Sequence, residues 1–137
     1  MAAVDSNVTT GLPGLDRVLK GLLVGDNVVW EVDSIDDYTP FVRPYVDAAV
    51  RAGFRVIYFR FAGHEALLED RAGVDVHVLR PQDGFESFIA RIHAVIEEAG
   101  RGAHYVFDCL SELAGDWYSD QMLGNFFMLT CPYLYDV

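Results

Sequence analysis

The chain has 137 residues, is 52% hydrophobic and 13% aromatic, and carries a formal net charge of -11. These values predict a single folded domain and disfavour non-specific binding to nucleic acid or an anionic membrane, because both repel an acidic surface. No apolar run reaches the roughly 18 residues that a membrane-spanning helix needs, and residues 1–10 lack the basic and apolar blocks of a secretion signal. Cys109 and Cys131 have no metal-ligand spacing, so we expect thiols in a reducing, cytoplasmic compartment.

The first half of the chain predicts helix, strand and helix in turn. Residues 12–20 have the character of a short helix, and residues 27–33 (NVVWEVD) form an apolar run typical of a central parallel strand. Thr39 is a candidate N-cap and Pro40 a candidate first residue for the helix that follows. Its apolar residues recur at helical spacing until Gly53, and Pro44 is its one awkward position.

The second half continues the alternation. We expect strands at 54–61, 74–79 and 103–108, and helices at 64–70, 84–99 and 117–129. The helix at 84–99 is the clearest, because its apolar residues fall on one face. Strand–helix alternation predicts an α/β fold of three layers, with a parallel sheet covered on both faces.

The turn after the 27–33 strand is unlike a phosphate-binding loop. Such a loop needs glycines that let backbone N–H groups surround the phosphates, a lysine, and a hydroxyl for magnesium. Here the turn reads DSIDDYTP, which puts Tyr38 where the lysine belongs and Thr39 where the hydroxyl belongs. Asp33, Asp36 and Asp37 would face the phosphates, and like charges about 4 Å apart repel by roughly 1–4 kcal/mol. The turn therefore disfavours nucleotide binding.

Three segments carry a resemblance to a known family. The opening TGLPGLD, the 27–33 strand and HYVFDCLSEL together resemble a RecA/KaiC-like domain with a degenerate P-loop, over residues 10–113. In that family the aspartate matching Asp108 holds magnesium through water, and Thr39 matches the magnesium hydroxyl. A structural alternative for Asp108 is a cap for a helix that begins near Leu110.

A closer resemblance covers almost the whole chain. It is similar to the N-terminal region of phosphoenolpyruvate synthase-related (PEP/pyruvate-binding) proteins, on the segments GLPGLDRVLKGL, GDNVVWEVDSIDDYTPFV, FIARIHAVIEEAGRGA and YVFDCLSELAGDWYSDQMLGNFFMLTCPYLYD. In that family the nucleotide and PEP/pyruvate chemistry belongs to a downstream ATP-grasp-type domain and a phosphohistidine-bearing domain. No catalytic residue is therefore carried over to this chain.

The resemblance implies a single domain, residues 1–137, from the N-terminus of a larger protein. Its expected role is a non-catalytic assembly or regulatory module without a cofactor, whose partners are the rest of the parent chain (the ATP-grasp-type domain) or a second copy. RecA-like sheets insert a later strand between the strands matching 27–33 and 103–108. Because the chain stops at Val137, we expect a sheet that lacks this strand or receives it from a neighbour.

Two alternatives keep a ligand at the sheet. Asp33, Asp36, Asp37 and Asp108 could converge at the carboxyl ends of the strands and bind Mg²⁺, as in a response-regulator receiver domain. A kinase or ATPase with an atypical phosphate site would instead use arginines, with Arg43, Arg55 and Arg60 as candidates. The four histidines show no metal-ligand spacing and are interpreted as surface or helix-face residues.

The C-terminal region is dense in aromatic residues. One helix cannot turn all of these side chains inward, so some are predicted to form an interface with a partner, the alternative being that they pack on the sheet. The predicted interface residues are Trp117, Tyr118, Phe126, Phe127 and Tyr133.

Overall fold

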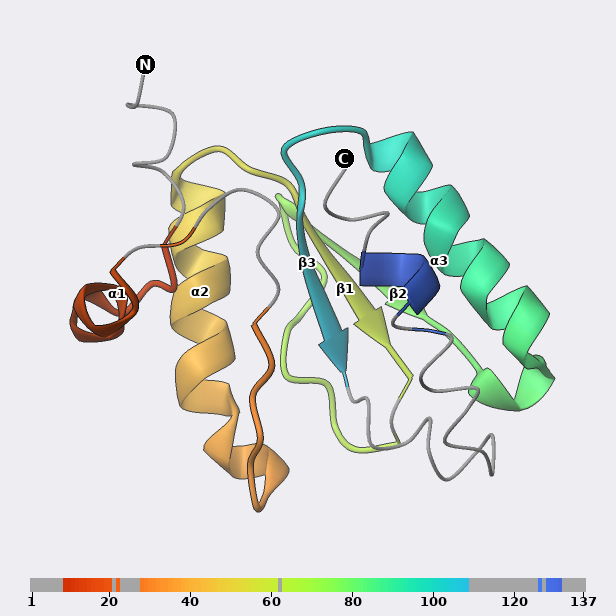
Figure 1. Cartoon of the computed structure of the whole chain (residues 1–137), viewed down its shortest axis with the longest axis horizontal. Helices are drawn as coiled ribbons and strands as arrows, with labels where there is room; N and C mark the ends of the chain where they lie inside the picture. The colour runs from red at the N-terminus through yellow and green to blue at the C-terminus, as the bar shows by residue number, and fades with distance from the viewer. Residues whose placement is uncertain are drawn as a thin grey trace.

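The computed structural model describes residues 9–20, 22, 28–61, 63–108, 126 and 128–131. Its elements in chain order are α1 (Pro13–Leu19), η2 (Ile35–Asp37), α2 (Thr39–Arg51), β1 (Val56–Arg60), β2 (Val74–Val78), η3 (Pro81–Asp83), α3 (Phe85–Ala99) and β3 (His104–Asp108). Helix α2 lies on one side of the sheet and α3 on the other (Figure 1). The predicted α/β fold with a parallel sheet is therefore confirmed.

The sheet has three strands in the order β2-β1-β3, and both pairings are parallel. Val56 lies opposite Val74 and His104, and Arg60 lies opposite Val78 and Asp108. The central strand β1 is apolar at nearly every position because it is covered on both faces, as expected for a parallel sheet. All three strands agree with the segments predicted from their apolar runs.

Alternation along β1 divides the core into two clusters. Ile57 and Phe59 face α3, where they join Phe88, Ile92 and Ile96. The alternate residues Val56 and Tyr58 face α2 and join Val42, Val46 and Val106. Since successive strand residues point to opposite faces, Arg60 and Asp108 at the strand ends belong to the α2 face.

Helix α2 follows the predicted pattern with a shift of one residue at its start. Tyr38 is the N-cap, so Thr39 and Pro40 are the first two helical residues and Thr39 is not the cap. Pro44 lies inside the helix, which continues through it to Arg51. Val42, Val46 and Ala49 recur at helical spacing and pack against the sheet.

Two predicted elements are wrong. No strand forms over residues 28–33, although Trp30 stacks on Phe41 with ring centroids 4.5 Å apart. An apolar run becomes a strand only beside a partner strand, and no strand of the described part of the chain pairs with these residues. No helix forms over residues 64–70, where Leu67 and Leu68 are buried in the α2-face cluster as parts of a loop.

The predicted helix at 117–129 lies mostly outside the described residues. Phe126 and residues 128–131 are helical. Phe126 and Thr130 are buried, whereas Met128 and Leu129 are exposed. None of the helices in the described part of the chain has the length and apolar character needed to cross a bilayer.

The opening motif TGLPGLD attaches α1 to α2. The carboxylate of Asp16 accepts hydrogen bonds from the backbone N–H of Thr10 (2.8 Å), from the hydroxyl of Thr10 (2.7 Å) and from the hydroxyl of Thr9. Gly11 has a φ of +84°, and a Cβ at this position would lie 2.2 Å from the carbonyl oxygen of Pro44. The motif therefore needs glycine both for its backbone conformation and for its contact with α2.

Gly11→Ala is expected to lower the free energy of unfolding by about 2 kcal/mol or more, because it combines a strained backbone with a steric clash. Urea unfolding followed by circular dichroism measures this change.

Gly14→Ala is the matched control. Gly14 lies in α1, and a Cβ there would meet only the Arg17 guanidinium at 3.9 Å. Alanine in a helix is favoured over glycine, so this variant should be neutral or more stable by up to about 1 kcal/mol. Equal stability of the two variants would show that the contact between Gly11 and Pro44 does not contribute to the fold.

Candidate functional site

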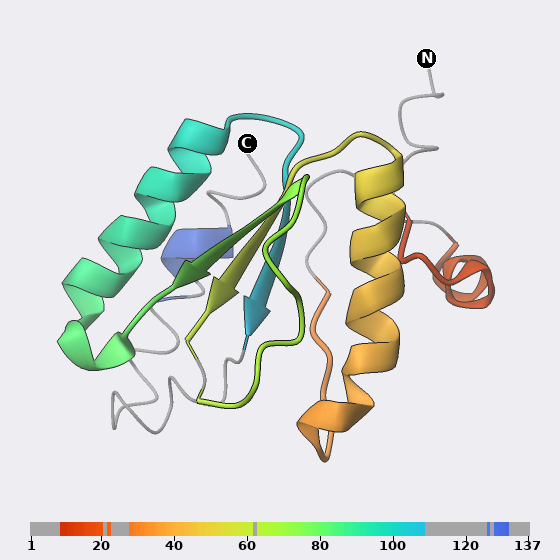
Figure 2. The ribbon, with the colours of Figure 1, turned by 180° about the vertical axis from the view of Figure 1, so that it is seen from behind.

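A network of polar side chains lies at the carboxyl ends of β1 and β3, on the α2 face. Tyr58 comes from the middle of β1, Asp108 is the last residue of β3, and His64 lies in the loop after β1. Figure 2 shows from behind that this loop, residues 61–73, passes beneath the ends of these strands before β2 begins. Strand carboxyl ends are where open parallel sheets tend to place functional groups.

Asp108 is the centre of the network. Its carboxylate is 1% exposed. The hydroxyl of Tyr58 donates to Oδ2, and Nε2 of His64 lies 2.8 Å from Oδ1. The backbone N–H of Leu67 donates in turn to the Tyr58 oxygen at 3.4 Å. Both carboxylate oxygens are therefore engaged by side chains of the same chain, which is what a buried charge requires.

His64 has both ring nitrogens beside acceptors. Nδ1 lies 2.7 Å from the carbonyl oxygen of Glu65, and a carbonyl can only accept, so Nδ1 carries a hydrogen. Nε2 faces the Asp108 carboxylate, which is best matched by a second N–H. Partial burial and the nearby Arg60 lower the pKa of His64, but the hydrogen bonds to Glu65 and Asp108 outweigh them, and the pKa is raised. The geometry therefore favours an imidazolium ion paired with Asp108.

Tyr58 acts as a donor over the whole ordinary pH range. Burial, and then its hydrogen bond to Asp108, raise the pKa of the Tyr58 hydroxyl well above its usual value. With Tyr58 protonated and both nitrogens of His64 engaged, none of these groups is free to take a proton from a substrate. The network holds the loop to the sheet and does not form a general base.

Arg60 holds the same loop from its other side. A terminal nitrogen of its guanidinium donates to the backbone oxygen of His64. Arg60 lies opposite Asp108 in the sheet, yet no ion pair joins them, because Tyr58 and His64 already occupy the carboxylate. Its Nε is buried and has no hydrogen-bond partner among the described residues.

The structure separates the four carboxylates predicted to hold magnesium. Asp33, Asp36 and Asp37 are exposed in the turn before α2, whereas Asp108 is buried at the end of β3 and bonded to His64. Within residues 9–20, 22, 28–61, 63–108, 126 and 128–131, no group of three or more His, Cys, Asp or Glu side chains is placed to hold a metal ion. Thr39 is half-buried in the first turn of α2.

The predicted arginine and interface residues are placed as follows. Arg55 pairs with Asp75 at 2.6 Å at the amino end of β1, opposite to the end that Asp33 and Thr39 occupy, and Arg43 is exposed on α2.

Of the predicted interface residues, Phe126 is 2% exposed and contacts Phe88 and Phe107 in the α3-face cluster, so it belongs to the core and not to an interface. Trp117, Tyr118, Phe127 and Tyr133, and the possible capping of a helix near Leu110, lie outside the described residues.

Sequence reasoning missed Tyr58 and His64. From the sequence, His64 is interpreted as a surface or helix-face residue, because the four histidines show no metal-ligand spacing. A usable signal is present in β1, where Tyr58 and Arg60 lie two residues apart and therefore share one face of a buried strand. Buried polar groups need partners, so this face predicts a polar neighbour at the strand ends.

His64→Gln is expected to lower the free energy of unfolding by about 1–3 kcal/mol near pH 5, by removing a hydrogen-bonded charge pair. Because the pKa of His64 is raised in the folded state, its stabilisation is complete below the unfolded pKa of about 6.5 and is lost as the pH rises through the folded pKa. The difference between wild type and variant should therefore shrink toward about pH 9, as measured by urea unfolding across this range.

His93→Gln is a control of opposite sign. The pKa of His93 is lowered, mainly by burial, so the folded state disfavours the protonated imidazole. Relative to wild type, His93→Gln should therefore have a higher free energy of unfolding near pH 5 than near pH 9. If the free energies of unfolding of wild type and His64→Gln differ by the same amount at every pH, the ion pair between His64 and Asp108 is contradicted.

Comparison with known proteins does not assign this chain to a family. No protein-family model matches it, and no curated protein matches it at a significant level. The functional argument therefore rests on the residues and geometry of the chain itself.

Proposed function

We propose that the chain is a RecA/KaiC-like domain with a decayed nucleotide site, and that it serves as a non-catalytic assembly or regulatory module of a phosphoenolpyruvate synthase-like protein. The observation that carries this proposal is the state of Asp108. In RecA/KaiC-like proteins the matching aspartate holds magnesium through water. Here its two oxygens are bonded to Tyr58 and His64.

The charges around Asp108 support the loss of the magnesium role. A hydrated divalent cation would have to displace the hydrogen bonds of Tyr58 and His64 from a carboxylate that is 1% exposed. It would also approach an imidazolium ion and the guanidinium of Arg60, and like charges repel strongly where water is excluded. A side-chain cation has thus replaced the metal as the partner of this aspartate.

The turn before α2 supports the loss of the phosphate site. A phosphate-binding loop must leave its backbone N–H groups free for the ligand. In this turn the N–H of Asp37 donates to Ser34 O (2.9 Å), that of Tyr38 donates to Ile35 O (3.0 Å), and that of Asp36 donates to the Ser34 hydroxyl (3.3 Å). These donors are used within the turn, which also carries the exposed carboxylates of Asp33, Asp36 and Asp37.

The arrangement of the sheet is compatible with the RecA/KaiC part of the proposal. Residues 28–33 lie between β3 and α2 in both ribbon views without joining the sheet (Figures 1 and 2). In a RecA-like sheet a further strand would lie between this segment and the strand of Asp108. Val28 and Val29 of this segment are exposed apolar residues, which is compatible with a role in assembly.

Isothermal titration calorimetry with ATP and Mg²⁺ is expected to show no saturable binding in the micromolar range, because neither the phosphate donors nor Asp108 are free. Saturable micromolar binding that Thr39→Ala or Asp108→Asn abolishes would contradict the proposal.

Mg²⁺ alone separates the proposal from the receiver-like alternative. Millimolar Mg²⁺ should leave the melting temperature unchanged, whereas a receiver-like acidic site would be stabilised by binding. A rise in melting temperature that disappears in Asp108→Asn would favour the receiver-like site. Asp47→Asn is the control, since it removes a carboxylate whose ion pair with Arg71 lies on the surface.

A further inference from the structure

We propose that the chain binds a small anion, a phosphate or carboxylate group on a short apolar body, in a cavity at the carboxyl ends of β1 and β2. The cavity has a volume of about 240 Å³, and its lining includes Arg60, Phe61, Leu79, Arg80 and Gln82. It lies toward β2, across the sheet from the turn of the decayed nucleotide site. The inference therefore does not depend on the proposed function.

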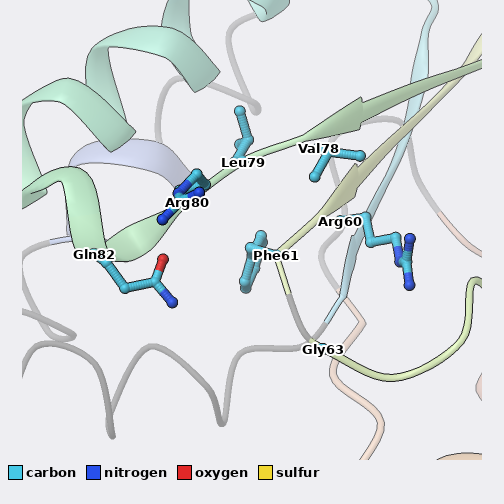
Figure 3. A pocket seen from close by; sticks show the side chains of 7 residues that line it. All are labelled: Arg60, Phe61, Gly63, Val78, Leu79, Arg80 and Gln82. Atoms are coloured by element: carbon cyan, nitrogen blue, oxygen red, sulfur yellow. The ribbon is translucent and has the colours of Figure 1, made fainter.

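The backbone fixes the two sides of the cavity. Arg60 and Val78 are the last paired residues of β1 and β2, and the N–H of Leu79 then donates to Arg60 O at 2.9 Å. This bond extends the ladder past the strand ends and holds the chain at Arg60 beside the chain that continues to Arg80. Figure 3 shows Phe61 between these two arginines, with the amide of Gln82 extending toward it.

Arg60 has a donor that no acceptor among the described residues satisfies. One terminal nitrogen donates to the backbone of His64, and Nε is buried without a hydrogen-bond partner among the described residues. No ion pair joins Arg60 to Asp108, whose oxygens are bonded to Tyr58 and His64. Arg60 is half-buried, and an anion that accepts a hydrogen bond from the unsatisfied donor stabilises such a guanidinium.

Arg80 provides a second, more accessible positive charge. Its only ion pair within the described part of the chain is with Asp83, at 3.7 Å, and the two side chains are 72% and 62% exposed. Such a surface pair contributes little and is readily exchanged for a better acceptor. A neighbouring hollow of about 160 Å³ is lined by Arg80 and Arg91 together with Ser87 and Asp83, so a second arginine lies near Arg80 beside one carboxylate.

The chemistry of the lining defines the class of ligand. A planar guanidinium matches carboxylate and phosphate groups, which accept two parallel hydrogen bonds. Phe61 and Leu79 offer an apolar surface beside the two charges, and the Gln82 amide can donate or accept. The volume is below the range typical of sites for drug-sized molecules, so a small metabolite is expected and a nucleotide is not.

The test is a titration with inorganic phosphate and, separately, with succinate, at an ionic strength held constant with NaCl. Saturable shifts of backbone amide signals from residues 60, 61, 63, 78–80 and 82 in NMR spectra are expected, with dissociation constants on the order of 1 mM. Saturation by phosphate alone, by succinate alone or by both would each support the site and identify the group it prefers. No saturation by either below about 20 mM would overturn it.

Arg80→Gln is expected to weaken binding about tenfold, because it removes a charge-assisted hydrogen bond from an exposed position. Arg101→Gln is the control, since it removes the same charge from an exposed turn before β3, at the opposite end of the sheet. Equal affinity of the two variants would overturn the proposal. The two variants also distinguish this inference from the proposed function. ATP binding that is lost in Arg80→Gln but kept in Asp108→Asn would occur in this cavity and not at the decayed nucleotide site.

Discussion

The buried carboxylate of Asp108 is the constraint on which this end of the molecule depends. A charge that is withdrawn from water is tolerated only when hydrogen bonds and an opposite charge replace its hydration. Tyr58 supplies the first hydrogen bond from the neighbouring strand, and His64 supplies the second together with a positive charge. Satisfying Asp108 thus requires the loop after β1 to fold back across the strand ends.

The folded loop has consequences beyond the network itself. It carries Leu67 and Leu68 into the α2-face cluster. The N–H of Leu67 also bonds to the Tyr58 oxygen, so the polar and apolar contacts of the loop reinforce one another. A sequence that predicts a short helix here therefore forms an irregular loop, because tertiary contacts outweigh local propensity.

Arg60 connects the network to the cavity. It lies opposite Asp108 in the sheet and would be its natural partner, but the carboxylate is already engaged by Tyr58 and His64. The guanidinium instead holds the loop through the backbone of His64 and lines the cavity beside β2. The bonds of Asp108 to Tyr58 and His64 thus leave Arg60 beside the cavity without an ion pair to this carboxylate.

Much of the fold could be predicted from the sequence, whereas the arrangement of the site could not. Apolar periodicity alone located β1, β2, β3, α2 and α3 to within about two residues, because each buries a continuous apolar face. The lack of glycine and lysine in the 33–39 turn predicts that the turn does not bind phosphate, and this stays a prediction. Periodicity failed for 28–33, since an apolar run cannot report whether a partner strand lies beside it. The bonds of Asp108 were decided only by the tertiary structure: they join residues 50 and 44 positions apart, and such pairs depend on strand register and loop path, which no local pattern contains.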